Sequence, residues 1–89
     1  MNDFLSEKDA KAVLEILVEQ LGVEESQLAA AARLQEDLGA DSLTLTEIVL
    51  TLEEQLNISI PDETAEKVST VGDIFEMLAG LLAERPAKP

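Results

Sequence analysis

Apolar residues recur at helical spacing in three segments of this chain, and this periodicity constrains the fold more than any other feature. The clearest segment is 45–56, where apolar positions fall at i, i+3, i+4, i+7 and i+11. They are Leu45, Ile48, Val49, Leu52 and Leu56. Residues 12–21 and 71–82 carry similar stripes, and no strand pattern runs beyond a few residues. Because this spacing puts the apolar side chains on one side of a helix, an all-α fold is predicted.

Capping residues and helix breakers predict the limits of four helices. The expected starts are Ser6, Asp41 or Ser42, Pro61, and Thr70 with Asp73. The expected ends are Gly22, Asn57 and Lys67. The intervening segment 23–40 has no clear period, and Leu28 and Leu34 are expected to hold it against the core as a long loop.

These elements predict a small four-helix bundle with three longer helices, one short helix and a long loop between the first two. The chain has two Phe and neither Trp nor Tyr, so the core must be largely aliphatic. We expect residues 1–89 to form a single domain, ordered over about 6–84, with a flexible tail at 85–89.

Acidic residues dominate the charge of the chain. There are 19 Asp and Glu against 6 Lys and Arg, a formal net charge of −13. Between Arg33 and Lys67 lie nine acids and no base. Nucleic acids and anionic membranes are bound through basic side chains, so neither is an expected partner, and proteins with basic patches are expected instead. The simple alternative is a solvated acidic face that keeps the protein soluble.

The chain contains neither cysteine nor histidine. The absence of cysteine fits a reducing compartment and excludes thiolate metal sites. No basic leader or long apolar run is evident, so a cytoplasmic location is expected. An EF-hand loop read from Asp37 fails because Ser42 and Ile48 stand where Gly and Glu are required. No metal site is therefore predicted, and loose binding of divalent ions by clustered carboxylates stays open.

Three roles are open to Ser42 from the residues alone. It can be a plain N-cap of the second helix, although Asp41 caps equally well. It can be a nucleophile, but the chain has no His to act as its base. It can also be the attachment point of a phosphate-bearing arm, because the N–H groups and dipole of a helix N-terminus favour a phosphodiester charge.

Two motifs carry a resemblance to a known family. Residues 38–43 read Leu-Gly-Ala-Asp-Ser-Leu, and residues 60–63 read Ile-Pro-Asp-Glu. With these motifs the chain resembles the acyl carrier proteins over roughly residues 12–82. The resemblance implies that Ser42, flanked by Asp41 and Leu43, bears a covalent 4′-phosphopantetheine. It also implies that the protein is a carrier and not an enzyme.

The resemblance further implies a set of partner enzymes. These are a phosphopantetheinyl transferase and acyl-transfer, condensing and reducing enzymes whose basic patches meet the second helix. The residues expected to dock them are Leu43, Thr44, Glu47, Leu50, Glu53 and Glu54. Ordinary surface apolarity is the alternative for the two leucines. Contacts of this kind are expected to be weak and salt-sensitive, with the carrier acting as a monomer.

In this fold acyl chains can enter between the helices. By analogy, the candidate residues of such a cavity are Val49, Leu52, Leu56, Ile60, Ala65 and Val68. Helical periodicity alone assigns the same residues to the core.

The resemblance implies that the protein holds growing or finished acyl chains as thioesters, most often in fatty acid biosynthesis. A specialised carrier for another lipid, a polyketide or another acyl product is the alternative, because Thr44 and Leu56 differ from the residues common in the family. A helical adaptor that carries nothing is a more distant alternative.

Overall fold

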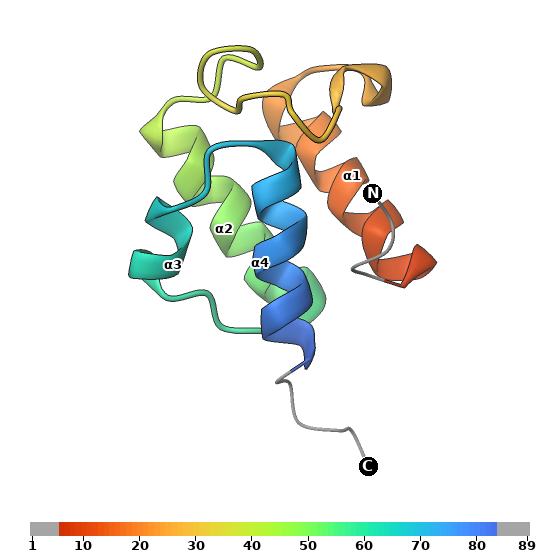
Figure 1. Ribbon diagram of the computed structural model, residues 1–89, viewed down its shortest axis with the longest axis vertical. Coiled ribbons are helices and arrows are strands. Elements are labelled where there is room, and N and C mark those ends of the chain that lie inside the picture. Colours follow the sequence, from red (N-terminus) through yellow and green to blue (C-terminus); the bar gives the residue numbers. More distant parts are fainter. Residues whose placement is uncertain (1–5, 84–89) are drawn as a thin grey trace.

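The structure is a computed structural model, and it describes residues 6–83. Within this range the regular elements are helical, and they follow one another as in Figure 1. They are α1 (Glu7–Leu21), the 3₁₀ helix η1 (Glu25–Gln27), α2 (Ser42–Leu56), α3 (Asp62–Glu66) and α4 (Val71–Ala83). The all-α prediction, with three longer helices and one short helix, is confirmed. The expected tail at 85–89 lies outside the described residues.

The ends of α1 and α2 follow from short-range capping. The Ser6 hydroxyl accepts a hydrogen bond from the Asp9 amide at 3.2 Å, and Gly22 ends α1 in the left-handed region at φ 68°. Asn57 ends α2 in the same region at φ 56°. Gly and Asn tolerate this conformation best, so both helices stop where the sequence predicts.

The ends of α3 and α4 also agree with the sequence, with one shift. Pro61 precedes α3, and the last helical residue of α3 is Glu66. Lys67 was expected inside the last turn of this helix, but it is the C-cap that follows it. At the start of α4 the Thr70 hydroxyl accepts from the Asp73 amide, and the Asp73 carboxylate accepts from the Thr70 amide, each at 3.1 Å. This reciprocal pair is a capping box, and it fixes where α4 begins.

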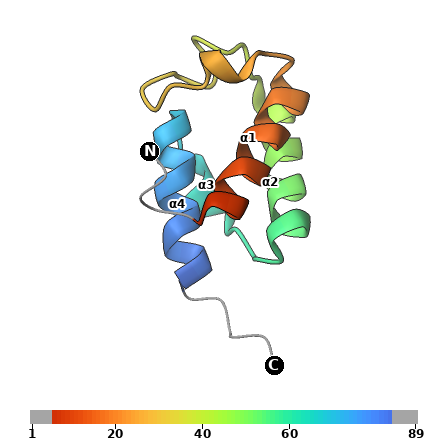
Figure 2. The ribbon, with the colours of Figure 1, turned by 90° about the vertical axis from the view of Figure 1, so that its right-hand side faces the viewer.

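Three helices share the core. The buried side chains of α1, α2 and α4 face one another, and α1 packs against α2. Helix α3 lies on the side of the molecule away from α1 (Figures 1 and 2). The buried residues of the three core helices are Ala10, Val13, Ile16, Leu17, Ile48, Leu52, Leu56, Val71, Ile74, Phe75 and Leu78. None of the described residues of the core is polar or charged. No helix of the described residues has the length and apolar character needed to cross a membrane.

The long loop between α1 and α2 is held by the core and by the start of α4. Leu28 and Leu34 are buried, as predicted. The Leu34 amide donates to the Ser69 carbonyl at 2.9 Å, and the Gly72 amide donates to the Ala30 carbonyl at 2.9 Å. These bonds lay the loop across the top of α4 and fix the segment that leads into α2.

Candidate functional site

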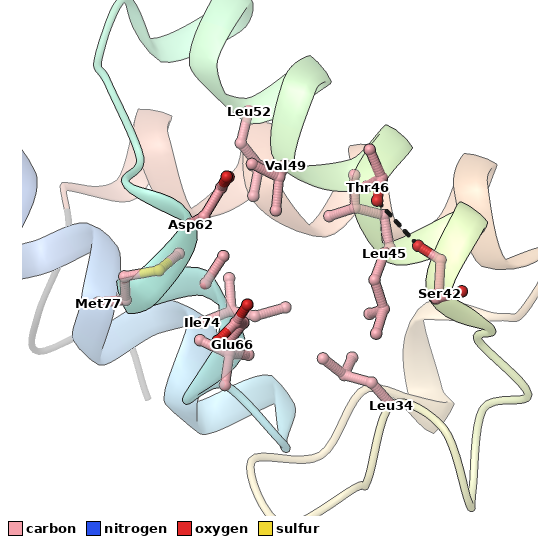
Figure 3. A pocket seen from close by; sticks show the side chains of 13 residues that line it. Leu34, Ser42, Leu45, Thr46, Val49, Leu52, Asp62, Glu66, Ile74 and Met77 are labelled. Carbon is pink, nitrogen blue, oxygen red and sulfur yellow. Dashed lines mark hydrogen bonds between the residues drawn. The ribbon is translucent and has the colours of Figure 1, made fainter.

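Ser42 is the first residue of α2, and its side chain is exposed. The helix is capped by Asp41, whose carboxylate accepts from the Thr44 amide at 2.8 Å. Of the two caps that the sequence allowed, the structure therefore has Asp41. The Ser42 carbonyl accepts from the Thr46 hydroxyl at 2.9 Å, a bond that uses the main chain of Ser42 and not its hydroxyl (Figure 3).

The segment before Ser42 is anchored to the core by buried side chains and a backbone hydrogen bond. Leu38 and Ala40 are buried, and the Ala40 amide donates to the Leu34 carbonyl at 2.8 Å. Gly39 between them has φ 75°, a conformation that Gly adopts without strain. The chain thus turns sharply over the core and presents Ser42 at the surface on a rigid helix end.

Hydrogen bonding to Thr44 lowers the pKa of Asp41 below its ordinary value, because the backbone amide of Thr44, and to a lesser extent its hydroxyl, donates to the ionised carboxylate. Asp41 is thus a charged cap at neutral pH, directly before Ser42. A nucleophilic serine would need a general base, and the chain contains no His.

A cavity of about 410 Å³ opens beside Ser42, between α2 on one side and α3 and α4 on the other (Figure 3). Its lining is largely apolar, with acidic side chains on α3. The lining residues are Leu34, Ser42, Leu45, Thr46, Ile48, Val49, Leu52, Asp62, Ala65, Glu66, Val68, Ile74 and Met77. In Figure 3, Ser42 lies at one end of the cavity and Met77 at the other.

The structure divides the six residues that the sequence proposed for an acyl cavity. Four of them line it: Val49, Leu52, Ala65 and Val68. Leu56 and Ile60 do not line it and are buried in the core. Val49 and Leu45, expected in a fully buried stripe, are only half-buried because they face the cavity.

Sequence reasoning missed the contribution of α4 and of the loop to this cavity. Ile74 and Met77 come from α4, and Leu34 comes from the loop between α1 and α2. Helical spacing placed Ile74 on the core-facing side, Leu34 was expected to hold the loop against the core, and Met77 was not singled out. No local signal distinguishes a residue that fills the core from one that borders a gap in it.

The proposed docking residues do not share one environment. Leu43 and Leu50 are 67% and 55% exposed, and they are the large apolar side chains that stand out on the described surface. Glu47 and Glu54 are exposed, and Thr44 is half-buried. Glu53, also expected to dock partners, is less exposed than Glu47 and Glu54.

Glu53 is half-buried, and its carboxylate accepts a hydrogen bond from the Ile60 amide at 2.7 Å. This bond joins α2 to the segment that leads into α3. As for metal ions, the described residues 6–83 hold no group of three or more acidic side chains arranged around a common point.

Comparison with known proteins bears on this site directly. Residues 11–78 match the protein family described as the phosphopantetheine attachment site, which spans most of the chain and includes Ser42. The cofactor of this family is therefore phosphopantetheine, and the chain carries its attachment domain.

Solved structures agree. A candidate acyl carrier protein from Mycobacterium tuberculosis is 29% identical with a TM-score of 0.75, over 81% of this chain and 96% of that one. The acyl carrier protein from Enterococcus faecalis is 32% identical with a TM-score of 0.73, over 84% of this chain and 95% of that one. By sequence, fold and attachment domain, the protein belongs to the acyl carrier protein family, whose members carry acyl groups on phosphopantetheine.

Proposed function

We propose that Ser42 is the attachment residue and that the protein carries acyl chains in fatty acid biosynthesis. The observation that supports this most is the position of Ser42: its side chain is exposed at the start of α2, Asp41 takes over the capping role, and an apolar cavity begins beside it. In this role the protein is a cytoplasmic monomer and a substrate of other enzymes.

The residues around Ser42 fit a phosphopantetheine group. The first N–H groups of a helix have no partner within the helix, and the helix dipole favours a negative charge there. A phosphodiester on the Ser42 oxygen would lie at this end of α2, a helix of 15 residues. When bound, the group supplies the thiol that this cysteine-free chain lacks.

The cavity suits an acyl chain. Leu45, Val49 and Leu52 from α2 face Ala65 and Val68 from the α3 side, and these side chains need no hydrogen-bond partner. Covering an apolar chain there removes its surface from water, a gain of roughly 25 cal/mol per Å². We propose that this cavity shelters the cargo between visits to enzymes.

The surface of α2 suits partner enzymes with basic patches. Leu43 and Leu50 supply exposed apolar area, and the carboxylates of Glu47 and Glu54 lie on the same helix. An apolar centre with a charged rim is typical of protein interfaces. We propose that a phosphopantetheinyl transferase and the acyl-handling enzymes all dock here, with Thr44 at the edge, and that their affinity falls as salt concentration rises.

The attachment role is tested by intact mass measurement. The unmodified protein is incubated with a phosphopantetheinyl transferase and CoA, beside Ser42→Ala and the matched control Ser59→Ala, which changes another exposed serine. The wild type and Ser59→Ala are expected to gain one phosphopantetheine each, and Ser42→Ala none. A mass gain in Ser42→Ala would place the attachment elsewhere.

A specialised carrier for another lipid or a polyketide is the second candidate, and Thr46 is the observation that favours it. This polar residue lines the cavity one turn from Ser42. Mass analysis of the acyl species on protein isolated from its own cells distinguishes the two. Saturated chains of several lengths are expected for fatty acid synthesis, and a single unusual acyl group would support the specialised carrier.

A further inference from the structure

The short helix α3 forms one wall of the cavity, yet it has no buried residue of its own. It is only five residues long, and Asp62, Ala65 and Glu66 face the cavity from it. In Figure 3 the side chains of Asp62 and Glu66 lie across the opening from those of α2. A helix this short is not stable alone, so its position depends on what holds its two ends.

The C-terminal end of α3 is held by the start of α4. The Ser69 and Thr70 amides donate to the Asp73 carboxylate at 3.0 and 3.1 Å. The Ser69 carbonyl accepts from the Leu34 amide of the long loop at 2.9 Å. This end is thus attached to α4 through the Asp73 side chain and to the long loop through a backbone hydrogen bond.

The N-terminal end depends on Glu53. Ile60, one residue before Pro61, is buried, and its amide donates to the Glu53 carboxylate at 2.7 Å. The backbone carbonyl of Glu53 also accepts from the Asn57 and Ile58 amides. Both the main chain and the side chain of this one residue therefore fix the turn between α2 and α3.

Glu53 lies next to Leu52 and one turn after Val49, which form the opposite wall of the cavity. The bond to Ile60 therefore links the α2 wall to the segment that leads into α3. We propose that Glu53 is a positioning residue that holds α3 over the cavity and thereby determines how well an acyl chain is sheltered. This proposal rests on the proposed function, because it assumes that Ser42 carries the cargo.

Glu19 in α1 provides a control of the same charge. It is exposed and is not among the residues proposed to dock partner enzymes. Glu53→Ala removes the acceptor for the Ile60 amide, whereas Glu53→Gln removes the charge and keeps a carbonyl oxygen that can accept. If Glu53 acts only through its charge in docking, the two Glu53 variants should behave alike, because both lack the charge. If Glu53 positions α3, only Glu53→Ala should show a defect, because only it lacks the acceptor.

The first measurement is amide hydrogen exchange in the unloaded full-length protein. In Glu53→Ala the Ile60 and α3 amides are expected to exchange at least about tenfold faster, with α1 amides unchanged. Glu53→Gln and Glu19→Ala are expected to stay within about threefold of the wild type. Equal acceleration of the α1 amides would mean general unfolding and would overturn the proposal, as would no change at Ile60.

The second measurement compares octanoyl-loaded with unloaded protein by thermal unfolding. Loading is expected to raise the Tm of the wild type, Glu53→Gln and Glu19→Ala, and Glu53→Ala is expected to lose most of that gain. If Glu53→Ala and Glu53→Gln both lose it, charge and not positioning is responsible. If the wild type cannot be loaded at Ser42, the proposed function fails, while the exchange experiment still tests the contact with Ile60.

Discussion

Helices α1 and α3 lie on opposite sides of the molecule and are held in place by different means (Figures 1 and 2). Four residues of α1 are buried, and it packs against α2. By contrast, none of the residues of α3 is buried. Ala65 packs against the core only in part, and hydrogen bonds of the segments before and after α3 add to this contact. Hydrophobic burial spreads over a whole helix face, whereas a few end contacts can be lost one at a time.

This difference indicates a division of labour. The packed helices form a scaffold that keeps the start of α2, and with it Ser42, in a defined place. Under the proposal above, α3 is the wall that yields when an acyl chain enters the cavity. Elements that move for function are drawn from the least stable part of a fold, and α3 fits that description.

The largest expected effect comes from the scaffold. Phe75 is fully buried, and Phe75→Ala should cost about 3–5 kcal/mol in the free energy of unfolding, through lost burial and the cavity left behind. In the wall, Val68→Ala removes a half-buried side chain and should cost only about 1 kcal/mol. Urea unfolding followed by circular dichroism measures both. Equal losses would erase the distinction between scaffold and wall.

A pair of glycines in α4 tests how the long loop is attached. A Cβ on Gly72 would lie 3.0 Å from the Ala30 carbonyl oxygen, so Gly72→Ala should cost about 1–3 kcal/mol by pushing the loop away. A Cβ on Gly80 meets nothing within 4 Å, so Gly80→Ala should stabilise the helix by about 0.5–1 kcal/mol. Thermal unfolding should move the Tm in opposite directions. Shifts of the same sign would contradict the close contact at Gly72.

The cap at the start of α4 should make stability depend on pH. Hydrogen bonds from the Ser69 and Thr70 amides lower the pKa of Asp73 below its ordinary value of 3.8. Asp73→Ala should cost about 1 kcal/mol at neutral pH, as expected for a cap. Because the folded pKa is the lower one, the advantage of the wild type is fully present above 3.8 and is lost as pH falls through the folded pKa.

The measurement for Asp73 is a series of unfolding curves of both proteins from neutral to acidic pH. The gap between wild type and Asp73→Ala should narrow below pH 3.8. A gap of constant size down to the lowest pH at which both proteins fold would show that the carboxylate charge does not contribute.

The smallest expected effect comes from placing one glycine in α1 and one in α3. Glu15 in α1 and Glu63 in α3 are both exposed, and Gly at an exposed helical position costs roughly 0.7–1 kcal/mol. Glu15→Gly should show this loss in urea unfolding. Glu63→Gly should show less than about 0.5 kcal/mol, because α3 opens locally before the whole chain unfolds. Amide exchange in α3 should nevertheless accelerate. Equal losses would mean that α3 unfolds only together with the scaffold.

Local signals predicted the helices well because they act over a few residues. Ser6 with Asp9, and Thr70 with Asp73, form contacts across one helical turn, and they behave in the structure as their types suggest. The exposed position of Ser42 followed from the same local pattern. Glu53 did not, because its partner Ile60 lies beyond the end of its helix, and an acid on a helix resembles a surface residue in the sequence.

The sequence by itself determined an acidic, all-α chain with a serine at the start of its second long helix, since charge, period and caps are properties of neighbouring residues. Tertiary structure alone decided which apolar residues fill the core and which border a cavity. Leu56 and Val49 belong to the same stripe, yet one is buried and the other faces the gap. The reason is physical: a cavity exists where helices distant in the sequence pack incompletely, and no single helix encodes the shape of its neighbours.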